Sequence, residues 1–400
     1  MHRSLNHDMP LAKAIKAEAQ RLGFELVGIT TPDPPEHLAV FEGWLSKGRH
    51  GTMGYLESKR ARQRRADPRQ ILPDCRSIVV LGVPYPAAGK GNDAGQAGPK
   101  TAGGDSSSLP IRGQVASYAW GNDYHEVLPK RLKVLVSFIE SQVGHPVPNR
   151  WYTDTGPILE RDLAQRAGLG WIGKNTCLIH PEKGSYFLLA EVLLGIDLEP
   201  DAPFVPDLCG TCTRCLDACP TACILPDRTI DARQCISYLT IELKSEVPAE
   251  MRSQTKEWVF GCDICQQVCP WNQRFAAPNG DPAFAARPGV PQPDLLEELS
   301  LSPQDFRAKF KGSPVKRAKR RGYLRNIAIA LGNSKNPAAV AALGNALQEE
   351  PEPLVRGHAA WALGQIGGEA ARRVLSHAAQ VEKDEAVLEE IHAALDATSN

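Results

Sequence analysis

Nine of the eleven cysteines in this 400-residue chain lie between residues 209 and 269, which constrains its fold more than any other feature. The total is odd and the N-terminus lacks the basic and then apolar pattern of a secretory signal, so a disulfide scaffold is not expected. Because the rest of the chain has an ordinary composition, with 42% hydrophobic and 23% charged residues, the cysteine-rich segment predicts metal binding or redox chemistry. No apolar run is long enough to span a bilayer, so we expect a cytoplasmic protein without membrane attachment.

The spacing of these cysteines is typical of iron–sulfur ligands. The first run has two, two and three residues between its cysteines and a proline after the last: Cys209, Cys212, Cys215 and Cys219. Bacterial ferredoxins hold [4Fe–4S] clusters with this pattern, in which the fourth cysteine ligates a second cluster. The second run contains only the last three positions of the pattern: Cys262, Cys265 and Cys269. Structural zinc is the alternative, but zinc sites normally use two separated C-x2-C pairs.

Two clusters need eight thiolates, and the two runs supply seven. Cys223 and Cys235 are the candidates for the eighth. Cys223 follows Cys219 by only four residues, so we expect it on the same helical turn, where it would face a cluster poorly. Cys235 lies in a loop that can fold back, and we choose it. The predicted ligands of one cluster are Cys209, Cys212, Cys215 and Cys269. Those of the other are Cys219, Cys235, Cys262 and Cys265. Small buried thiols are expected for the remaining three, Cys75, Cys177 and Cys223.

Two further domains are predicted on either side of this module. Over residues 1–200, helical patterns alternate with apolar strands at 25–30, 77–83 and 186–194, which predicts a layered α/β (α+β) domain. A segment rich in Gly, Ala, Ser and Pro at 86–110 is expected to be a flexible insertion. The cysteine module would occupy 201–280.

The last part of the chain, 281–400, is predicted to be a linker followed by all-α repeats. Residues 324–347 align with 355–379, and a third partial copy begins near Val387. Paired helices rich in Ala and Leu at this period are typical of HEAT-like repeats. So few copies would not be stable alone, and we expect them to pack on the rest of the protein.

A two-cluster module passes electrons, so the chain should also hold an acceptor site. No G-x-G-x-x-G follows a strand and no P-loop is present, which argues against nucleotide cofactors. Asp123, Tyr124 and His125 begin like the D-x-H-x-x-G cobalamin signature, but Leu128 stands where the glycine would be. A corrinoid ligated by histidine is therefore not indicated.

Five segments of the chain closely resemble epoxyqueuosine reductase: 120–128, 153–175, 209–221, 231–242 and 261–272. With the α/β part and the HEAT-like tail, the resemblance covers nearly the whole chain. It implies a cytoplasmic enzyme that reduces epoxyqueuosine to queuosine at the wobble position of tRNA, the last step of queuosine synthesis. It further implies base-off cobalamin, reduced to cob(I)alamin by two [4Fe–4S] clusters, in a domain similar to that of reductive dehalogenases.

The resemblance also implies roles for individual residues. Asp154 matches the family's proton donor, and opening an epoxide leaves an alkoxide that such an acid would protonate. Enclosed beside a corrin, this carboxyl would have a raised pKa. From the residues alone, Asp154 could instead be the N-cap of the helix that follows. Cobalamin contacts are implied at Arg65, Asp154, Lys174, Asn175, Leu178, Leu189 and Ser237.

Two basic runs, 59–69 and 311–325, stand out in a chain of zero net charge. Such runs are usually solvated faces, but the second precedes the helical repeats and includes an aromatic residue, as surfaces that bind RNA do. We assign it to tRNA, through Lys316, Arg317, Lys319, Arg320, Arg321 and Tyr323.

Two other functions are possible from the sequence. One is a corrinoid enzyme that dehalogenates a small molecule, although the basic runs and repeats argue against it. The other is a non-catalytic iron–sulfur electron carrier that docks a partner through its repeats. For the favoured function we expect a monomer that receives electrons from an unidentified low-potential donor.

Overall fold

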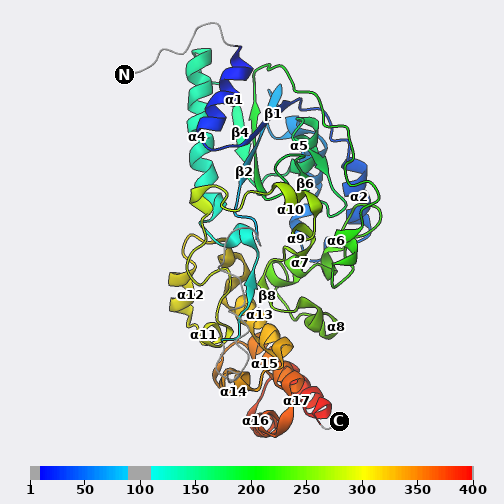
Figure 1. Cartoon of the computed structure of the whole chain (residues 1–400), viewed down its shortest axis with the longest axis vertical. Helices are drawn as coiled ribbons and strands as arrows, with labels where there is room; N and C mark the ends of the chain where they lie inside the picture. The colour runs from blue at the N-terminus through cyan, green and yellow to red at the C-terminus, as the bar shows by residue number, and fades with distance from the viewer. Residues whose placement is uncertain (1–9, 89–109, 399–400) are drawn as a thin grey trace.

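The computed structural model describes residues 10–88 and 110–398 of an elongated protein (Figure 1). The sheet and its helices form one end, the cysteine-rich segment lies in the middle, and the C-terminal helices form the other end (Figure 1). Most of the insertion predicted at 86–110 lies outside the described residues.

A four-stranded antiparallel sheet with the order β1-β2-β7-β4 organises the N-terminal part. Its strands are β1 (Leu26–Thr30), β2 (Ser77–Pro84), β7 (Phe187–Leu194) and β4 (Asn149–Tyr152). Three of them confirm the predicted strands, and every residue of β2 is buried, as its uniformly apolar sequence predicts.

Helices cover both faces of this sheet. Val79 and Leu81 of β2 pack toward α1 (Leu11–Arg21) and the long helix α4 (Tyr124–Val143). Ile78 and Val80 point the other way and pack against α5 (Glu160–Arg166). The alternation of side chains along one strand therefore builds two separate apolar layers. Two further helices of the N-terminal part are α2 (Leu38–Ser46) and α3 (Lys59–Ala66).

The cysteine-rich segment consists of short elements joined by turns. Its helices are α6 (Arg214–Asp217), α7 (Ile236–Ile241), α8 (Ala249–Arg252), α9 (Ile264–Gln267) and α10 (Pro270–Phe275). Its strand β8 (Trp258–Phe260) pairs in parallel with β3 (Gln114–Val115), which precedes α4 by only a few residues. A small hairpin from the N-terminal part, β5 (Trp171–Ile172) with β6 (Leu178–Ile179), lies against the module.

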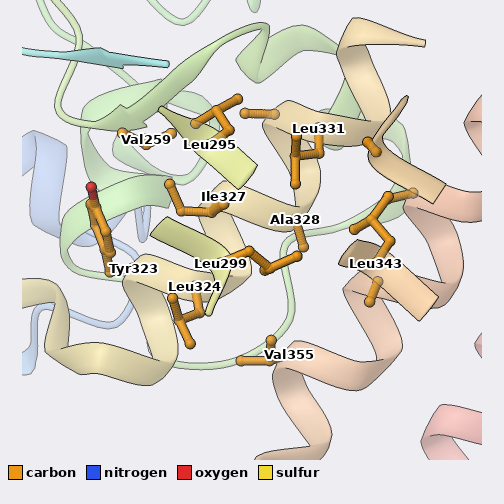
Figure 2. Packing of buried hydrophobic residues seen from close by; sticks show 14 of the residues in the cluster. Val259, Leu295, Leu299, Tyr323, Leu324, Ile327, Ala328, Leu331, Leu343 and Val355 are labelled. Atoms are coloured by element: carbon orange, nitrogen blue, oxygen red, sulfur yellow. The ribbon is translucent and has the colours of Figure 1, made fainter. Parts of the chain in front are cut away.

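The C-terminal part is all-α, as predicted. After α11 (Leu295–Leu299) and α12 (Pro303–Lys309) come the repeat helices α13 (Lys319–Ser334), α14 (Val340–Glu349), α15 (Pro353–Ile366), α16 (Gly368–Val381) and α17 (Glu385–Ala397). Their core is continuous with the cysteine module, because Val259 of β8 lies with Leu295 and Ile327 in one cluster (Figure 2).

One buried charge strengthens this contact. The side chain of Arg325 is 0% exposed and donates hydrogen bonds to the backbone carbonyls of Leu239, Leu243 and Ser245. The repeats therefore pack on the rest of the protein, as expected from their small number. None of the helices in the described ranges is long and apolar enough to cross a lipid bilayer.

Candidate active site

A cavity of about 410 Å³ opens between α2, α3, the turn before α5, and residues 228–232 of the cysteine module. Aromatic and apolar side chains provide much of its lining, namely Phe41, Trp44, Tyr55, Leu56 and Ile158. Arg65, Asp154 and Glu160 add polar groups. The structure thus brings two of the predicted site residues, Arg65 and Asp154, to one cavity.

Asp154 lies in the turn between β4 and α5, with its backbone in the left-handed region at φ 58°. Its Oδ2 accepts a hydrogen bond of 2.7 Å from the Tyr124 hydroxyl, and its own N–H donates one of 2.7 Å to Oε1 of Glu160. The side chain is 66% exposed. Asp154 is not a helix N-cap, since α5 begins only at Glu160 and no side chain caps it.

Local sequence explains why this turn forms. Thr153 anchors it to the sheet by donating a hydrogen bond of 2.9 Å to the carbonyl of Leu189. At Gly156 a Cβ atom would come within 2.5 Å of the Tyr152 ring, so only glycine allows the chain to pass there. An isolated left-handed aspartate costs free energy and persists where the surroundings hold it, as these contacts do.

Tyr124 reaches Asp154 because of how α4 begins. Asp123 is the N-cap of this helix and accepts the N–H of His125, which fixes the first turn. The Tyr124 ring is buried, and burial beside the Asp154 carboxylate raises its pKa well above its usual range, so its hydroxyl stays a donor. The segments 120–128 and 153–175 therefore meet at one carboxylate.

Two glutamates lie beneath the Asp154 turn. Glu160 is half-buried at the cavity, and burial together with the charge of Asp154 raises the pKa of its carboxyl. Glu191 of β7 is 0% exposed, and burial beside Glu160 and Asp154 raises its pKa well above the usual range. Neither glutamate is among the residues predicted from the sequence. The available signal was a lone carboxylate within the apolar run of β7.

Arg65 forms one wall of the cavity. It is 7% exposed, its guanidinium lies 5.5 Å from the centre of the Phe41 ring, and burial lowers its pKa. A cation held against an aromatic face in an apolar wall is suited to an anionic or amide group of a large ligand.

The other predicted cobalamin contacts do not line this cavity. The Lys174 ammonium donates to the carbonyls of Gly210 and Cys212, and Lys174 lines a separate, small cavity at the first cysteine run together with Asn175. Leu178 and Leu189 belong to the apolar layer on the α5 side of the sheet, and Ser237 lies in the first turn of α7. The turn that carries Lys174 and Asn175 borders the cavity through Ile172 and Thr176, and these five contacts stay predictions.

The first predicted ligand set is brought together. The small cavity is lined by all four of its members, Cys209, Cys212, Cys215 and Cys269. The Trp171 Nε1–H donates to the Cys209 sulfur at 3.4 Å. Hydrogen bonds to ligand sulfurs are one of the factors that set the potential of an iron–sulfur cluster.

The second set is more crowded than predicted. Cys219, Cys235 and Cys265 lie in one apolar cluster together with Cys223 and with Cys215 of the first set, whereas Cys262 packs in another cluster. The sulfur of Cys223 is 3.5 Å from that of Cys219. The expectation that Cys223 faces away is wrong, because α6 ends at Asp217 and a left-handed Ala222 turns the chain back.

The two remaining cysteines differ from each other. Cys177, expected to be a bystander, shares a hydrogen bond with Cys265. Cys75 is a buried thiol as expected, and burial raises its pKa to about 11.

The second basic run divides into exposed and buried residues. Arg317, Lys319 and Arg321 are exposed, and Lys316 is partly so. Tyr323, by contrast, is 1% exposed and donates to Glu298, so its ring cannot stack on a base. Arg320 is engaged in a two-hydrogen-bond ion pair with Glu350. The assignment of Tyr323 to tRNA is corrected, because α13 turns this residue into the core. Arg317 has a similar two-hydrogen-bond ion pair, with Glu242.

Comparison with known protein families divides the chain as the fold does. Residues 65–155 match the family described as Epoxyqueuosine reductase QueG, DUF1730. Residues 208–272 match the 4Fe-4S double cluster binding domain, and residues 319–396 match HEAT repeats. The predicted double-cluster module and repeats are therefore confirmed.

Individual relatives are similar over most of their length. Epoxyqueuosine reductase of Pseudomonas aeruginosa is 38% identical over 357 residues, which cover 89% of this chain and 95% of that protein. The Escherichia coli enzyme of the same name is 38% identical over 356 residues, 89% of each chain.

Solved structures agree. A crystal structure of an epoxyqueuosine reductase bound to an epoxyqueuosine-modified tRNA-Tyr stem loop superposes with a TM-score of 0.85 at 32% identity, covering 98% of this chain and 99% of that one. The Bacillus subtilis enzyme, in a structure whose catalytic loop is swung out of the active site, gives a TM-score of 0.84 at 32% identity, covering 97% and 98%.

Proposed function

Because the chain belongs to the epoxyqueuosine reductase family, an enzyme family that acts on tRNA, we propose that it reduces epoxyqueuosine to queuosine at the cavity beside Asp154. The observation that carries this proposal is the convergence at Asp154 of the Tyr124 hydroxyl, the half-buried Glu160 carboxyl and an open apolar cavity. Membership of this family replaces the two alternatives considered from the sequence, a dehalogenase and a non-catalytic electron carrier.

Asp154 is proposed to donate a proton to the epoxide oxygen. Reduction of an epoxide to an alkene consumes two electrons and two protons and releases the oxygen as water. The carboxyl lies at the cavity, and the Tyr124 hydroxyl orients one of its oxygens, so the other is free to face a substrate. A positioned acid of this kind contributes roughly 10²–10⁴-fold to the rate.

The cavity suits cobalamin in its chemistry. Flat aromatic and apolar walls match a corrin ring, and Arg65 matches its polar rim. When bound, a reduced corrinoid supplies a strong nucleophile or a low-potential electron. The residues of this chain would hold it through Arg65 and the aromatic wall, place the substrate against Asp154 and exclude water. We propose the domain over 1–200 as the cobalamin-binding one.

The two predicted cysteine sets are proposed to ligate the clusters of the module, which would occupy about 201–280. Cys209, Cys212, Cys215 and Cys269 line one cavity, which supports the first set. For the second set we keep Cys219, Cys235, Cys262 and Cys265, with Cys223 as a contacting thiol. Bound clusters supply one-electron steps. Residues 228–232, which lie in the sequence between Cys219 and Cys235, line the cavity, so an electron would have a short path from the second cluster to the cavity.

The exposed part of the second basic run, within the proposed domain 281–400, is proposed to contact the tRNA. The Arg317 guanidinium donates two hydrogen bonds to Glu242 and also interacts electrostatically with Tyr55 and Asp154. Because its side chain stays exposed, a phosphate that contacts it would lie near the mouth of the cavity. The Tyr55 ring is 57% exposed at that mouth and could stack on an unpaired base in place of Tyr323. The wobble nucleotide lies in a single-stranded loop, so its entry costs little unstacking.

The test is Asp154→Asn, which keeps the shape of the side chain and removes its proton. After reconstitution with iron, sulfide and cobalamin, we expect unchanged absorption of clusters and corrinoid and a loss of at least about 100-fold in queuosine formed. Queuosine and epoxyqueuosine are measured by mass analysis of nucleosides from the tRNA. Near-normal turnover in this variant would remove Asp154 from the proposed reaction.

A further inference from the structure

The carboxyl groups of Glu160 and Glu191 lie beneath the Asp154 turn, next to each other. Glu191 occupies the middle of β7, paired with Val80 on one side and Tyr152 on the other, and its side chain is 0% exposed. Neither of its oxygens has a hydrogen-bond partner of ordinary geometry among the described residues. The carboxyl of Glu160 is the group close enough to share a proton with it.

The charges around this pair do not neutralise it. From the turn it faces Asp154, a like charge. The α5 helix provides Arg161, whose exposed guanidinium is held by the carbonyl of Thr176. From α3 and α4, Arg65 and Tyr124 interact with Glu160 only at longer range. Within the described ranges neither glutamate forms an ion pair, and two adjacent carboxylates shielded from water, with the exposed Arg161 as the nearby cation, resist being charged together.

We propose that Glu160 and Glu191 share a proton and act together as positioning residues that hold the Asp154 turn in place. Glu160 does so directly, because its Oε1 accepts the Asp154 N–H at 2.7 Å. Glu191 acts through Glu160, because the shared proton keeps the Glu160 carboxyl in place beneath the turn. The left-handed backbone at Asp154 is held in part by this single hydrogen bond.

This arrangement makes the turn sensitive to pH. Burial raises the pKa of both carboxyls, so the pair favours folding most below the pKa of an unfolded glutamate, and its contribution falls as pH rises toward the pKa of the folded pair. When the shared proton leaves, two negative charges lie side by side beneath Asp154. We expect them to separate and release the turn, so that activity falls on the alkaline side.

The inference rests on the proposed role of Asp154, and four variants of the full-length, reconstituted enzyme test it. Glu160→Gln keeps an acceptor for the Asp154 N–H but cannot titrate, and Glu191→Gln removes the second charge. Glu160→Leu removes the acceptor. Glu182→Gln, at an exposed position of the same domain, is the matched control. For each, kcat and KM for the tRNA are measured from about pH 6 to pH 10, with the thermal unfolding temperature at both ends.

We expect Glu160→Leu to lower kcat at least about tenfold with KM changed less than about twofold, because a displaced turn impairs the proton donor and not tRNA binding. Both Gln variants should move the alkaline limb of the kcat profile upward by about one pH unit or more. Glu191→Gln should also unfold at a higher temperature than the wild type at alkaline pH and not at pH 6. Glu182→Gln should match the wild type throughout.

The proposal is overturned if the alkaline limb and the pH dependence of unfolding are the same in the wild type and both Gln variants. Because the Gln variants keep the size and polarity of the side chains, this comparison holds even where Glu160→Leu does not fold. If the glutamate variants behave like the wild type and Asp154→Asn is inactive, the positioning role of Glu160 and Glu191 is refuted and the proposed function stands. If Asp154→Asn is active, both the role of Asp154 as proton donor and the positioning role of the two glutamates are refuted.

Discussion

Replacement of Arg325 by methionine tests how the repeat helices are joined to the catalytic part of the protein. The guanidinium is completely buried and donates hydrogen bonds of 2.6, 3.0 and 2.6 Å to the carbonyls of Leu239, Leu243 and Ser245. Methionine has a similar length and no donor, so Arg325→Met would leave three carbonyls without their partner in a buried interface.

The magnitude follows from two opposing effects. Hydrogen bonds from a charged group contribute about 1.5–3 kcal/mol each, so the loss is roughly 5–9 kcal/mol. Burial lowers the pKa of Arg325 from 12.5 to about 10, and removing a charge that is so poorly solvated returns about 3 kcal/mol. The net destabilisation is therefore about 2–6 kcal/mol, comparable to the values known for breaking buried polar networks.

The assay is urea unfolding of the reconstituted enzyme, followed by circular dichroism for the helices and by visible absorption for the clusters. We expect the midpoint of the helical signal to fall more than that of the clusters, because the repeats lose their attachment first. Arg321→Met, exposed on the same helix, is the control and should change stability by less than about 0.5 kcal/mol. A loss below about 1 kcal/mol in Arg325→Met would refute the reasoning.

Three further outcomes are expected. Cys235→Ser should lose about half of the bound iron while Cys223→Ser keeps nearly all of it, measured as iron per protein after anaerobic reconstitution; equal losses would move Cys223 into the ligand set. Arg321→Gln should weaken tRNA binding several-fold and reduce the slope of log affinity against log salt concentration by about one. Arg320→Gln, which loses the ion pair with Glu350, should lower the free energy of unfolding and leave that slope unchanged. Arg356 holds the pKa of Glu382 at about 2, so this ion pair stabilises the repeats above about pH 4.5 and its contribution is lost as pH falls toward 2. Arg356→Met should therefore lower the free energy of unfolding by about 1–2 kcal/mol at pH 6 and by nearly nothing at pH 2, as measured by thermal unfolding.

The sequence predicted well wherever a pattern reports directly on burial or ligation. The uniformly apolar strand 77–83 is buried on both faces, and the first cysteine run and Cys269 line one cavity. The repeats of the C-terminal helices could be recognised in the sequence, because each copy must bury the same face against its neighbour and therefore keeps the same apolar pattern.

The errors have a common physical origin, since linear patterns do not show which way a side chain points. A basic run suggests an exposed surface, yet α13 turns Tyr323 and Arg325 into the core. Cys223 was expected to face away because the left-handed turn at Ala222 has no signature in the sequence. Glu191 went unnoticed because its meaning depends on Glu160, which lies in another element.

The pairing of β3 with β8 has a consequence for the order in which the chain folds during synthesis. Gln114 lies opposite Trp258 and Val115 opposite Phe260, so a strand made early must wait for a partner more than 140 residues later. Closing so long a loop is slow, and until then the strand edge is open to wrong pairings. Since β8 ends two residues before Cys262, we expect the pairing of β3 with β8 to bring Cys262, Cys265 and Cys269 toward the other cysteines in the same step. Insertion of iron and sulfide would then act as a late checkpoint, after which the repeat helices complete the shared core.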